Sequence, residues 1–271
     1  MKISADRAEP LFPTDEGILQ PASEPRFLRM ERYSPPLSLR PYLDHLWIAE
    51  WQVPRETTLP LDIVAMPCVN LVLMGESAFV AGVKTERQRH VLSGSGRIAG
   101  LRFKPGGFHS FSLHPVARIR NLEIPADSVH PSLSPAWARS CMSRDDFDIA
   151  AMALFEAIVN LPTHRAPRTA LVERILEACW RQPELPIPAI ANACGLKVRT
   201  LEALFHDSVG VSLVWIRRQI RAMSAMRMGQ QERRWAEIAQ QLGYSDQAHM
   251  TNQFRQVVGL PPDTFLRRTG R

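Results

Sequence analysis

The chain has 271 residues, 45% of them hydrophobic and 22% charged, which is typical of a soluble globular protein with room for two domains. No apolar run reaches 18 residues and residues 1–17 lack the apolar stretch of a signal peptide, so we expect neither a membrane span nor secretion, and a cytoplasmic location. The formal net charge of +6 lies wholly in residues 168–271, with 15 Lys and Arg against 9 Asp and Glu, a balance that suits a nucleic-acid partner.

Residues 1–25 are rich in proline and polar side chains without any period, which indicates a flexible lead-in. Residues 26–161 are then expected to form a β-rich sensor or dimerisation domain that ends in a helix. Residues 41–47 either open a short helix or enter a strand directly. Short apolar runs broken by Gly, Pro and Ser predict strands at 47–51, 62–66, 69–74, 78–80, 89–92, 97–103 and 117–120. Many short strands of this kind favour an antiparallel sandwich or barrel.

Several polar features of this half favour structural roles. Lys104-Pro105-Gly106-Gly107 lacks the residue order of a phosphate-binding loop and is interpreted as a plain turn. The histidines form no His-x-His pair, so no metal is expected at His90, His109, His114 or His130. The cysteines show neither zinc nor disulfide spacing and are expected to be buried thiols: Cys68, Cys141, Cys179 and Cys194. A thiol sensor that uses Cys68 or Cys141 is the alternative.

Residues 144–161 change to a helical period, with an apolar surface over much of the helix and three aspartates near its start. So wide an apolar face either packs on the β-rich domain or meets the same helix of a second subunit. Residues 162–168 contain two prolines and form a short linker. A helical domain is expected over 169–271, beginning with a helix at 169–181.

One short helical pattern occurs twice within residues 187–262. In the first copy a small residue stands four positions before a glycine, and a phenylalanine five positions before another: Ala191, Gly195, Phe205 and Gly210. The second copy repeats both spacings 48 to 49 residues later, with Ala239, Gly243, Phe254 and Gly259. A small residue lets two helices meet closely, and glycine adopts the positive φ that the tight turn requires. Each copy therefore predicts a helix-turn-helix, whose second helix lies in the major groove of DNA.

A helical repeat array is the structural alternative, but such arrays need about three or more copies for stability. Between the two copies, apolar residues at helical spacing over residues 213–226 predict a long helix that holds the two motifs at a set distance. Successive major grooves on one face of the duplex lie about 34 Å apart, so two DNA-binding motifs need such a spacer. The tandem DNA-binding interpretation is therefore favoured.

The second copy also contains Gly-Tyr-Ser-Asp-Gln at 243–247, Phe-Arg at 254–255 and Gly-Leu-Pro-Pro at 259–262. With the matching Gly195-Leu196 and Leu204-Phe205 of the first copy, roughly the last hundred residues resemble the AraC/XylS family of bacterial transcription regulators. The resemblance implies a seven-helix domain whose two helix-turn-helix motifs grip successive major grooves. The domain order and the run over residues 100–108 resemble the small-barrel sensor domains of that family. The expected fold class is thus α+β, with a cupin-like or jelly-roll barrel before an all-α tandem helix-turn-helix domain.

The resemblance also implies which side chains contact DNA. In the first motif the second helix begins near Lys197, where the family often has a capping serine, whereas Ser245 or Asp246 is available to cap the second. Residues expected to face the bases are Lys197, Arg199, Thr200, Glu202, Ala203, His206, Gln247, Ala248, His249, Asn252 and Gln253. Arg199 is the best candidate for a bidentate contact with guanine, and the Gln and Asn side chains of the second motif, such as Gln247 and Asn252, can each pair with adenine. Phosphate contacts are expected from Arg217, Arg218, Arg221 and Arg255.

The leading interpretation is a sequence-specific regulator of transcription that binds double-stranded promoter DNA. Family resemblance makes activation through RNA polymerase more usual than repression, and leaves open whether the protein is a homodimer. The amino-terminal domain would bind an unknown small-molecule effector or dimerise. The alternative is an enzyme with its chemistry in the barrel and an accessory DNA-binding domain. The sequence shows no nucleophile elbow and no obvious paired carboxylates, so no catalytic residue, cofactor or metal is expected.

Overall fold

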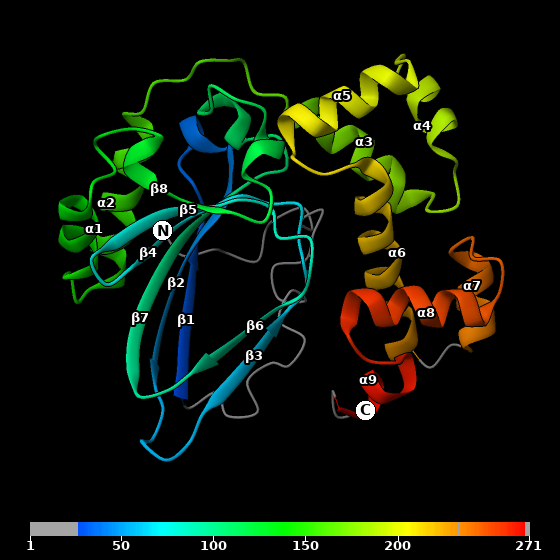
Figure 1. Ribbon diagram of the computed structural model, residues 1–271, viewed down its shortest axis with the longest axis horizontal. Coiled ribbons are helices and arrows are strands. Elements are labelled where there is room, and N and C mark those ends of the chain that lie inside the picture. Colours follow the sequence, from blue (N-terminus) through cyan, green and yellow to red (C-terminus); the bar gives the residue numbers. More distant parts are fainter. Residues whose placement is uncertain (1–26, 232–233, 269–271) are drawn as a thin grey trace.

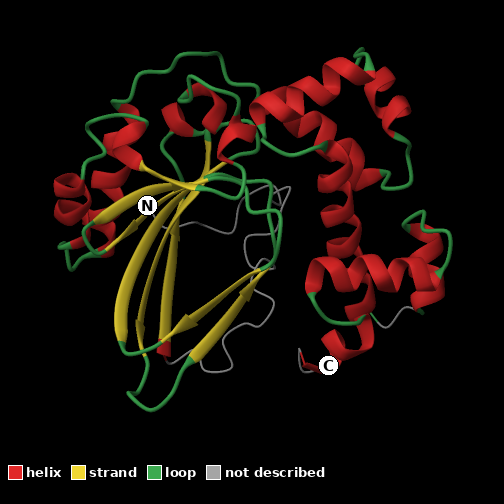
Figure 2. Ribbon diagram, in the orientation of Figure 1, coloured by secondary structure: helices red, strands yellow, loops and turns green. Residues whose placement is uncertain are grey.

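The computed structural model describes residues 27–231 and 234–268, which fold into a β-rich half and a helical half (Figures 1 and 2). The lead-in expected at 1–25 lies outside these residues. The strands are β1 Leu28–Tyr33, β2 Leu43–Gln52, β3 Leu59–Ile63, β4 Asn70–Met74, β5 Ser77–Ala81, β6 Gln88–Leu92, β7 Ser95–Phe103 and β8 Glu123–Pro125. The α-helices are α1 Pro135–Met142, α2 Phe147–Val159, α3 Thr169–Arg181, α4 Ile187–Ala193, α5 Val198–Ser208, α6 Leu213–Gln230, α7 Trp235–Gln241, α8 Gln247–Val258 and α9 Pro262–Arg268.

The sheet is open, which corrects the expectation of a closed barrel. Six antiparallel strands follow the order β1-β2-β7-β4-β5-β8, and β3 pairs with β6 in a separate two-stranded sheet. The edge strand β8 has only three residues, and Pro125 at its end has no N–H with which to extend a ladder. The β-rich half is therefore a large sheet faced by a small one.

Three local expectations in this half also need correction or resolution. The sequence pattern missed β1, because its charged residues obscure the alternation. Residues 117–120 are not a strand; Val116–Ile119 form a 3-10 helix, η4, which follows Pro115 and ends before Asn121 at φ 62°. After Pro41 the chain enters strand β2 at Leu43, so no helix opens there.

The two faces of the large sheet have different chemistry. One face carries the apolar core, including Leu46, Leu71 and Leu101, and is covered by α1 and α2. The opposite face carries polar and aromatic side chains and lies across from the β3–β6 sheet (Figure 1). Because successive residues of a strand point to opposite sides, the same strands supply side chains to the core and to the opposite, polar face of the sheet.

The helix predicted over 144–161 is confirmed as α2. Asp146 caps it, since its carboxylate accepts from the backbone N–H groups of Asp148 and Ile149. Leu154 is buried against the sheet side, whereas Ile149 and Met152 remain exposed. The apolar face of α2 is thus only partly buried within this chain.

The helical half begins at α3, whose bounds match the predicted helix, and the predicted long spacer helix is α6. One continuous apolar core runs from the sheet through α3, α4, α5 and the first part of α6. A second core joins the end of α6 to α7, α8 and α9, and includes one residue of the β-rich half, Val64. The first motif therefore shares the core of the β-rich half, while the second has its own core at the far end of α6 (Figure 1).

Candidate nucleic-acid interface

The two predicted turns have the same geometry. Gly195 and Gly243 adopt φ of +67° and +68°. The residue after each glycine donates its backbone N–H to the carbonyl of the small residue five positions back: Leu196 to Ala191 and Tyr244 to Ala239, both at 2.9 Å. This pairing is the hydrogen-bond pattern of a helix that ends at a left-handed glycine. The repeated sequence spacing therefore corresponds to a repeated structure.

Helix α5 presents a polar outer side. Leu201, Leu204 and Phe205 are buried in the core beneath it. The expected base-facing residues are all exposed: Lys197, Arg199, Thr200, Glu202, Ala203 and His206. Lys197 occupies the cap position and makes no side-chain cap bond, so the helix start lacks the stabilisation that serine would supply.

Helix α8 repeats this arrangement, and its N-terminus is capped by a side chain. Asp246 accepts from the backbone N–H of His249 at 2.7 Å, which confirms its capping role and lowers the pKa of its carboxyl. Met250 and Phe254 are buried, and the outer side chains are exposed or half-buried: Gln247, Ala248, His249, Asn252 and Gln253. Contacts to Ser245 and Gln253 orient the His249 ring, at 3.1 Å and 2.7 Å.

Two of the arginines expected at phosphate are engaged with the protein backbone. Arg217 donates to the carbonyl of Pro183 at 2.8 Å, and Arg221 to that of Leu242 at 2.7 Å and to that of Gly243. The Arg221 guanidinium also stacks on Tyr244, 4.5 Å from the ring centroid, and burial lowers its pKa. These two side chains tie α6 to the segment before the first motif and to the turn of the second.

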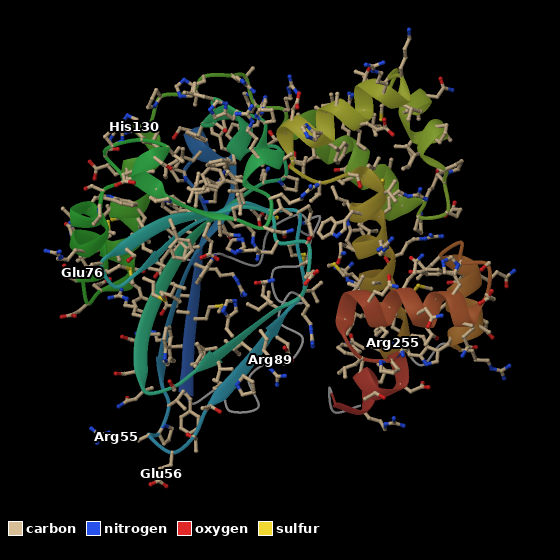
Figure 3. The ribbon with its side chains drawn as sticks, viewed as in Figure 1. Arg55, Glu56, Glu76, Arg89, His130 and Arg255 are labelled. Carbon is tan, nitrogen blue, oxygen red and sulfur yellow. The ribbon has the colours of Figure 1, made fainter. Side chains whose placement is uncertain are left out.

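The remaining two expected phosphate contacts are more open. Arg218 is half-buried on α6, and Arg255 is exposed on the surface of α8 (Figure 3).

The carboxy-terminal end of α5 abuts the β-rich half. His109, in the 3-10 helix η3 (Phe108–Ser110), lies with Nδ1 3.2 Å from the carbonyl of Asp207. Arg168 donates to Ser208 Oγ at 3.2 Å, and a Cβ on Gly210 would stand 3.1 Å from Val116. The Lys104–Gly107 turn packs nearby, where Lys104 pairs with Glu173 on α3 at 2.8 Å. The Lys104–Gly107 turn thus contacts both halves of the molecule, a structural role that agrees with its interpretation as a plain turn.

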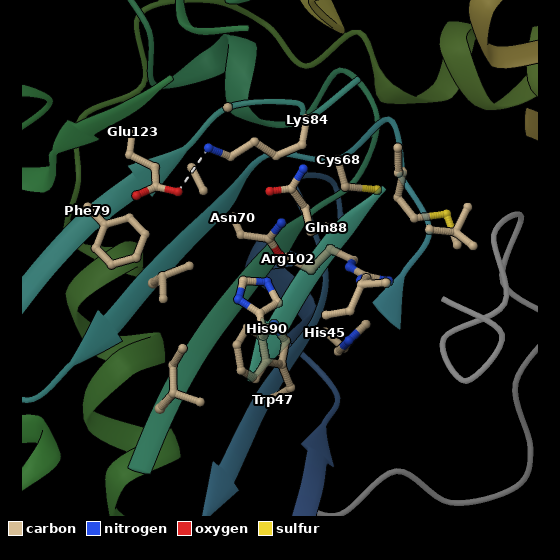
Figure 4. A pocket seen from close by; sticks show the side chains of 18 of the residues that line it. His45, Trp47, Cys68, Asn70, Phe79, Lys84, Gln88, His90, Arg102 and Glu123 are labelled. Atoms are coloured by element: carbon tan, nitrogen blue, oxygen red, sulfur yellow. Dashed lines mark ion pairs between the residues drawn. The ribbon is translucent and has the colours of Figure 1, made fainter. Parts of the chain in front are cut away.

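The β-rich half contains a cavity of about 260 Å³ between the large sheet and the β3–β6 sheet (Figure 4). Its lining includes His45, Trp47, Asn70 and Arg102. The sequence pattern did not single out these residues, because a polar residue alternating with apolar ones is equally typical of a solvent-facing strand. Only the overlying β3–β6 sheet turns that face into a pocket.

The cysteines are free, and Cys68, Cys141 and Cys179 are buried as expected, with Cys194 half-buried. Burial raises the pKa of Cys68 to about 12 and also raises that of Cys141. Both thiols are therefore held in the unreactive protonated form, which disfavours the thiol-sensor alternative. No helix in the described part of the chain has the length and apolarity needed to cross a bilayer.

Comparison with known proteins assigns the two halves differently. Residues 169–268 match the model of a helix-turn-helix domain, and residues 31–125 match that of a domain of unknown function, DUF6597. The HTH-type transcriptional regulator GlxA of Rhizobium meliloti (strain 1021) is 31% identical over 109 residues, 40% of this chain and 33% of that protein. The transcriptional activator NphR of a Rhodococcus species is 25% identical over 128 residues, 46% of this chain and 38% of that protein.

Among solved structures, a transcriptional regulator with an AraC-type DNA-binding domain from Chromobacterium violaceum is 20% identical, with a TM-score of 0.35, over 36% of this chain and 91% of that chain. The match spans 33% and 38% of the length of these two curated relatives. Residues 169–268 are therefore a helix-turn-helix domain similar to those of AraC-type transcription regulators.

Proposed function

We propose that the chain is a sequence-specific DNA-binding transcription regulator that inserts α5 and α8 into successive major grooves of promoter DNA. The observation that carries this proposal is the matched exposure of the two helices. Each buries its apolar side in a core and leaves outward the side chains suited to base edges, notably Arg199 on α5 and Asn252 on α8.

The spacer between the motifs supports a two-groove contact. Helix α6 has 18 residues, which corresponds to a length of about 27 Å. Arg217 fixes the segment before the first motif to this helix, and Arg221 fixes the turn of the second motif to it. A rigid spacer of this length suits grooves that recur about every 34 Å.

Phosphate contacts belong to the same proposal. Among the described residues, Arg218 and Arg255 make no hydrogen bond or ion pair that would compete with a phosphate. Arg218 lies on α6, which connects the two motifs, and Arg255 lies on α8 of the second motif. For Arg217 and Arg221, which already donate to carbonyls, phosphate contact stays a prediction for their unused N–H groups. The net charge of the helical half adds a sequence-independent attraction to DNA.

The finer functional assignment is also a proposal. The β-rich half senses a small-molecule effector in its cavity, and the DNA-bound protein activates transcription through RNA polymerase. A second copy docks on the exposed apolar side of α2, where Ile149 and Met152 are 50% and 71% exposed. Sedimentation of the wild type and of Met152→Glu tests the dimer, since a buried carboxylate at that contact would yield monomers.

Sequencing the DNA retained by the purified protein, followed by binding measurements on that DNA and on random DNA, tests the central proposal. Arg199→Ala and Asn252→Ala are expected to lower the preference for the retained sequence by about 1–3 kcal/mol each, because each removes a bidentate base contact. Arg218→Ala is the matched control, and it should weaken binding to both DNAs alike. Equal losses on both DNAs for Arg199→Ala would reject base reading by α5.

A further inference from the structure

The cavity in the β-rich half is built on one continuous face of the large sheet (Figure 4). Arg102 on β7 lies directly between His45 on β2 and Asn70 on β4, its two cross-strand neighbours. Side chains at such positions point to the same side of a sheet. The opposite wall comes from Ile63 on β3, the segment after it, and Gln88 on β6.

An apolar platform lies next to Arg102 on this face. A Cβ on Gly100 would stand 2.4 Å from Cε2 and Cζ2 of Trp47, so only glycine at this position lets the indole lie across the sheet. Phe79 and Ile98 extend the apolar lining. The platform therefore suits a flat hydrocarbon or an aromatic ring.

The charges beside the platform are unequal. Lys84 is neutralised by Glu123, with Nζ 2.9 Å from Oε1. Asp44, the acidic residue next to His45, is hydrogen-bonded to that ring at 2.8 Å. Arg102 Nε is buried and has no hydrogen-bond partner among the described residues. A buried guanidinium N–H without a partner costs free energy that a bound anion offsets, and the planar fork of the guanidinium matches a carboxylate.

His45 does not compete for this role. Its side chain is only 2% exposed, and burial lowers the pKa of the imidazole, so the ring is neutral near pH 7. Among the described residues that line the cavity, Lys84 is paired with Glu123 and Arg32 has interactions of its own. Arg102 is therefore the cation that is left to pair with a bound anion.

We propose that this cavity binds a small organic acid whose carboxylate pairs with Arg102 while its apolar body lies on Trp47. The proposal rests on the effector-sensing role proposed above and names the chemical class of the effector. A volume of about 260 Å³ is at or below the low end of the ~300–1,000 Å³ typical of ligand sites. The site therefore takes a single ring or a short chain.

Titration calorimetry of the full chain with acids and their matched amides tests this assignment. The probes are benzoate, phenylacetate and hexanoate against benzamide, phenylacetamide and hexanamide, which have similar shapes without the charge. We expect at least one acid to bind, and its amide to bind at least about tenfold more weakly, because the amide loses a charge-assisted bidentate pair. Equal affinity for acid and amide, or binding of none of the three acids, would overturn the proposal.

Variants then locate the contact. Arg102→Met keeps an apolar stem and removes the charge, so it should lose at least about tenfold in affinity for the acid and little for the amide. Arg102→Lys keeps the charge without the fork and should fall between the two. Arg89→Met, at an exposed arginine on β6 outside the cavity lining, is the matched control and should bind like the wild type. Wild-type affinity for the acid in a folded Arg102→Met would assign the site elsewhere.

A gel shift with the retained DNA, on the same preparations, separates this proposal from the one on which it rests. DNA binding without acid binding rejects the ligand class alone. Acid binding without DNA binding rejects the regulator function and leaves the cavity assignment intact.

Discussion

Two buried histidines are expected to make the stability of this protein depend on pH. His45 lies in the cavity face beside Asp44 and Arg102, and His109 lies at the junction of the two halves beside Arg165 and Arg168. Burial, as the largest cause, lowers the pKa of both imidazoles in the folded protein. The unfolded chain, with histidine pKa values near 6.5, then binds more protons than the folded chain as the pH falls.

The free energy of unfolding is therefore expected to be highest above about pH 6.5 and to decline as the pH falls below that value. Urea unfolding at several pH values between about 5 and 8 measures this slope. His45→Asn and His109→Asn should each reduce the slope, whereas the exposed His164→Asn should leave it unchanged. A slope that neither buried-site variant alters would contradict this origin.

At the scale of single helices, α5 and α8 differ in whether a side chain caps the first turn, and a cap stabilises a helix. Lys197 stands at the cap of α5 without a cap bond, and Asp246 caps α8. Lys197→Ser is expected to raise the free energy of unfolding by about 1 kcal/mol, and Asp246→Ala to lower it by about 1 kcal/mol. Urea unfolding at neutral pH measures both.

Lys197→Ala separates the cap from the loss of the lysine itself. Alanine cannot cap the helix, so this control should not reproduce the gain seen with serine. The same serine variant should bind DNA less tightly although it is more stable, because it removes a cation from the proposed interface. Unchanged stability in Lys197→Ser would show that water already satisfies the first backbone N–H groups of α5.

At the scale of the whole molecule, Val64 connects the cavity to the second motif. It lines the cavity, and it is buried in the same apolar core as residues of α6 to α9. A second contact lies nearby, where a Cβ on Gly259 would stand 2.6 Å from the guanidinium carbon of Arg87. The first motif shares its core with the sheet, so the second motif is the part of the helical half that the effector proposed above would most readily release or hold.

Val64→Ala is expected to loosen this connection. Backbone amides of α8 and α9 should exchange faster with deuterated water, because the truncation removes apolar contacts between the β-rich half and the second core. Amides of α1 and α2 should keep their protection. Val91→Ala, at a valine on β6 that is 58% exposed, is the matched control. Faster exchange throughout the chain would indicate general destabilisation in place of a local connection.

The helical half was largely predictable because its signals are local. The two glycines of the turns, the apolar stripe of the spacer helix and the Asp246 cap are each specified by residues within a few positions of one another. The side chains of α5 and α8 expected at DNA came from the family resemblance, and in the structure they are exposed, with Gln253 half-buried. Their contacts with bases stay predictions.

The β-rich half depended on long-range pairing that no local pattern carries. Strand β2 lies beside β7, about fifty residues further along the chain, and β3 leaves the main sheet to pair with β6. Arg102 alternates with core residues along β7, and this alternation is equally typical of a strand that faces solvent and of one that faces a pocket. The pattern of short strands likewise did not show that the expected barrel would be an open sheet.

The sequence by itself thus determined the tandem motifs, since helix turns and caps are encoded by neighbouring residues. Only the tertiary structure decided that the polar face of the sheet is covered, that Arg102 faces a cavity, and that Val64 reaches the second motif. Each of these depends on segments far apart in the chain being brought together by shared apolar burial.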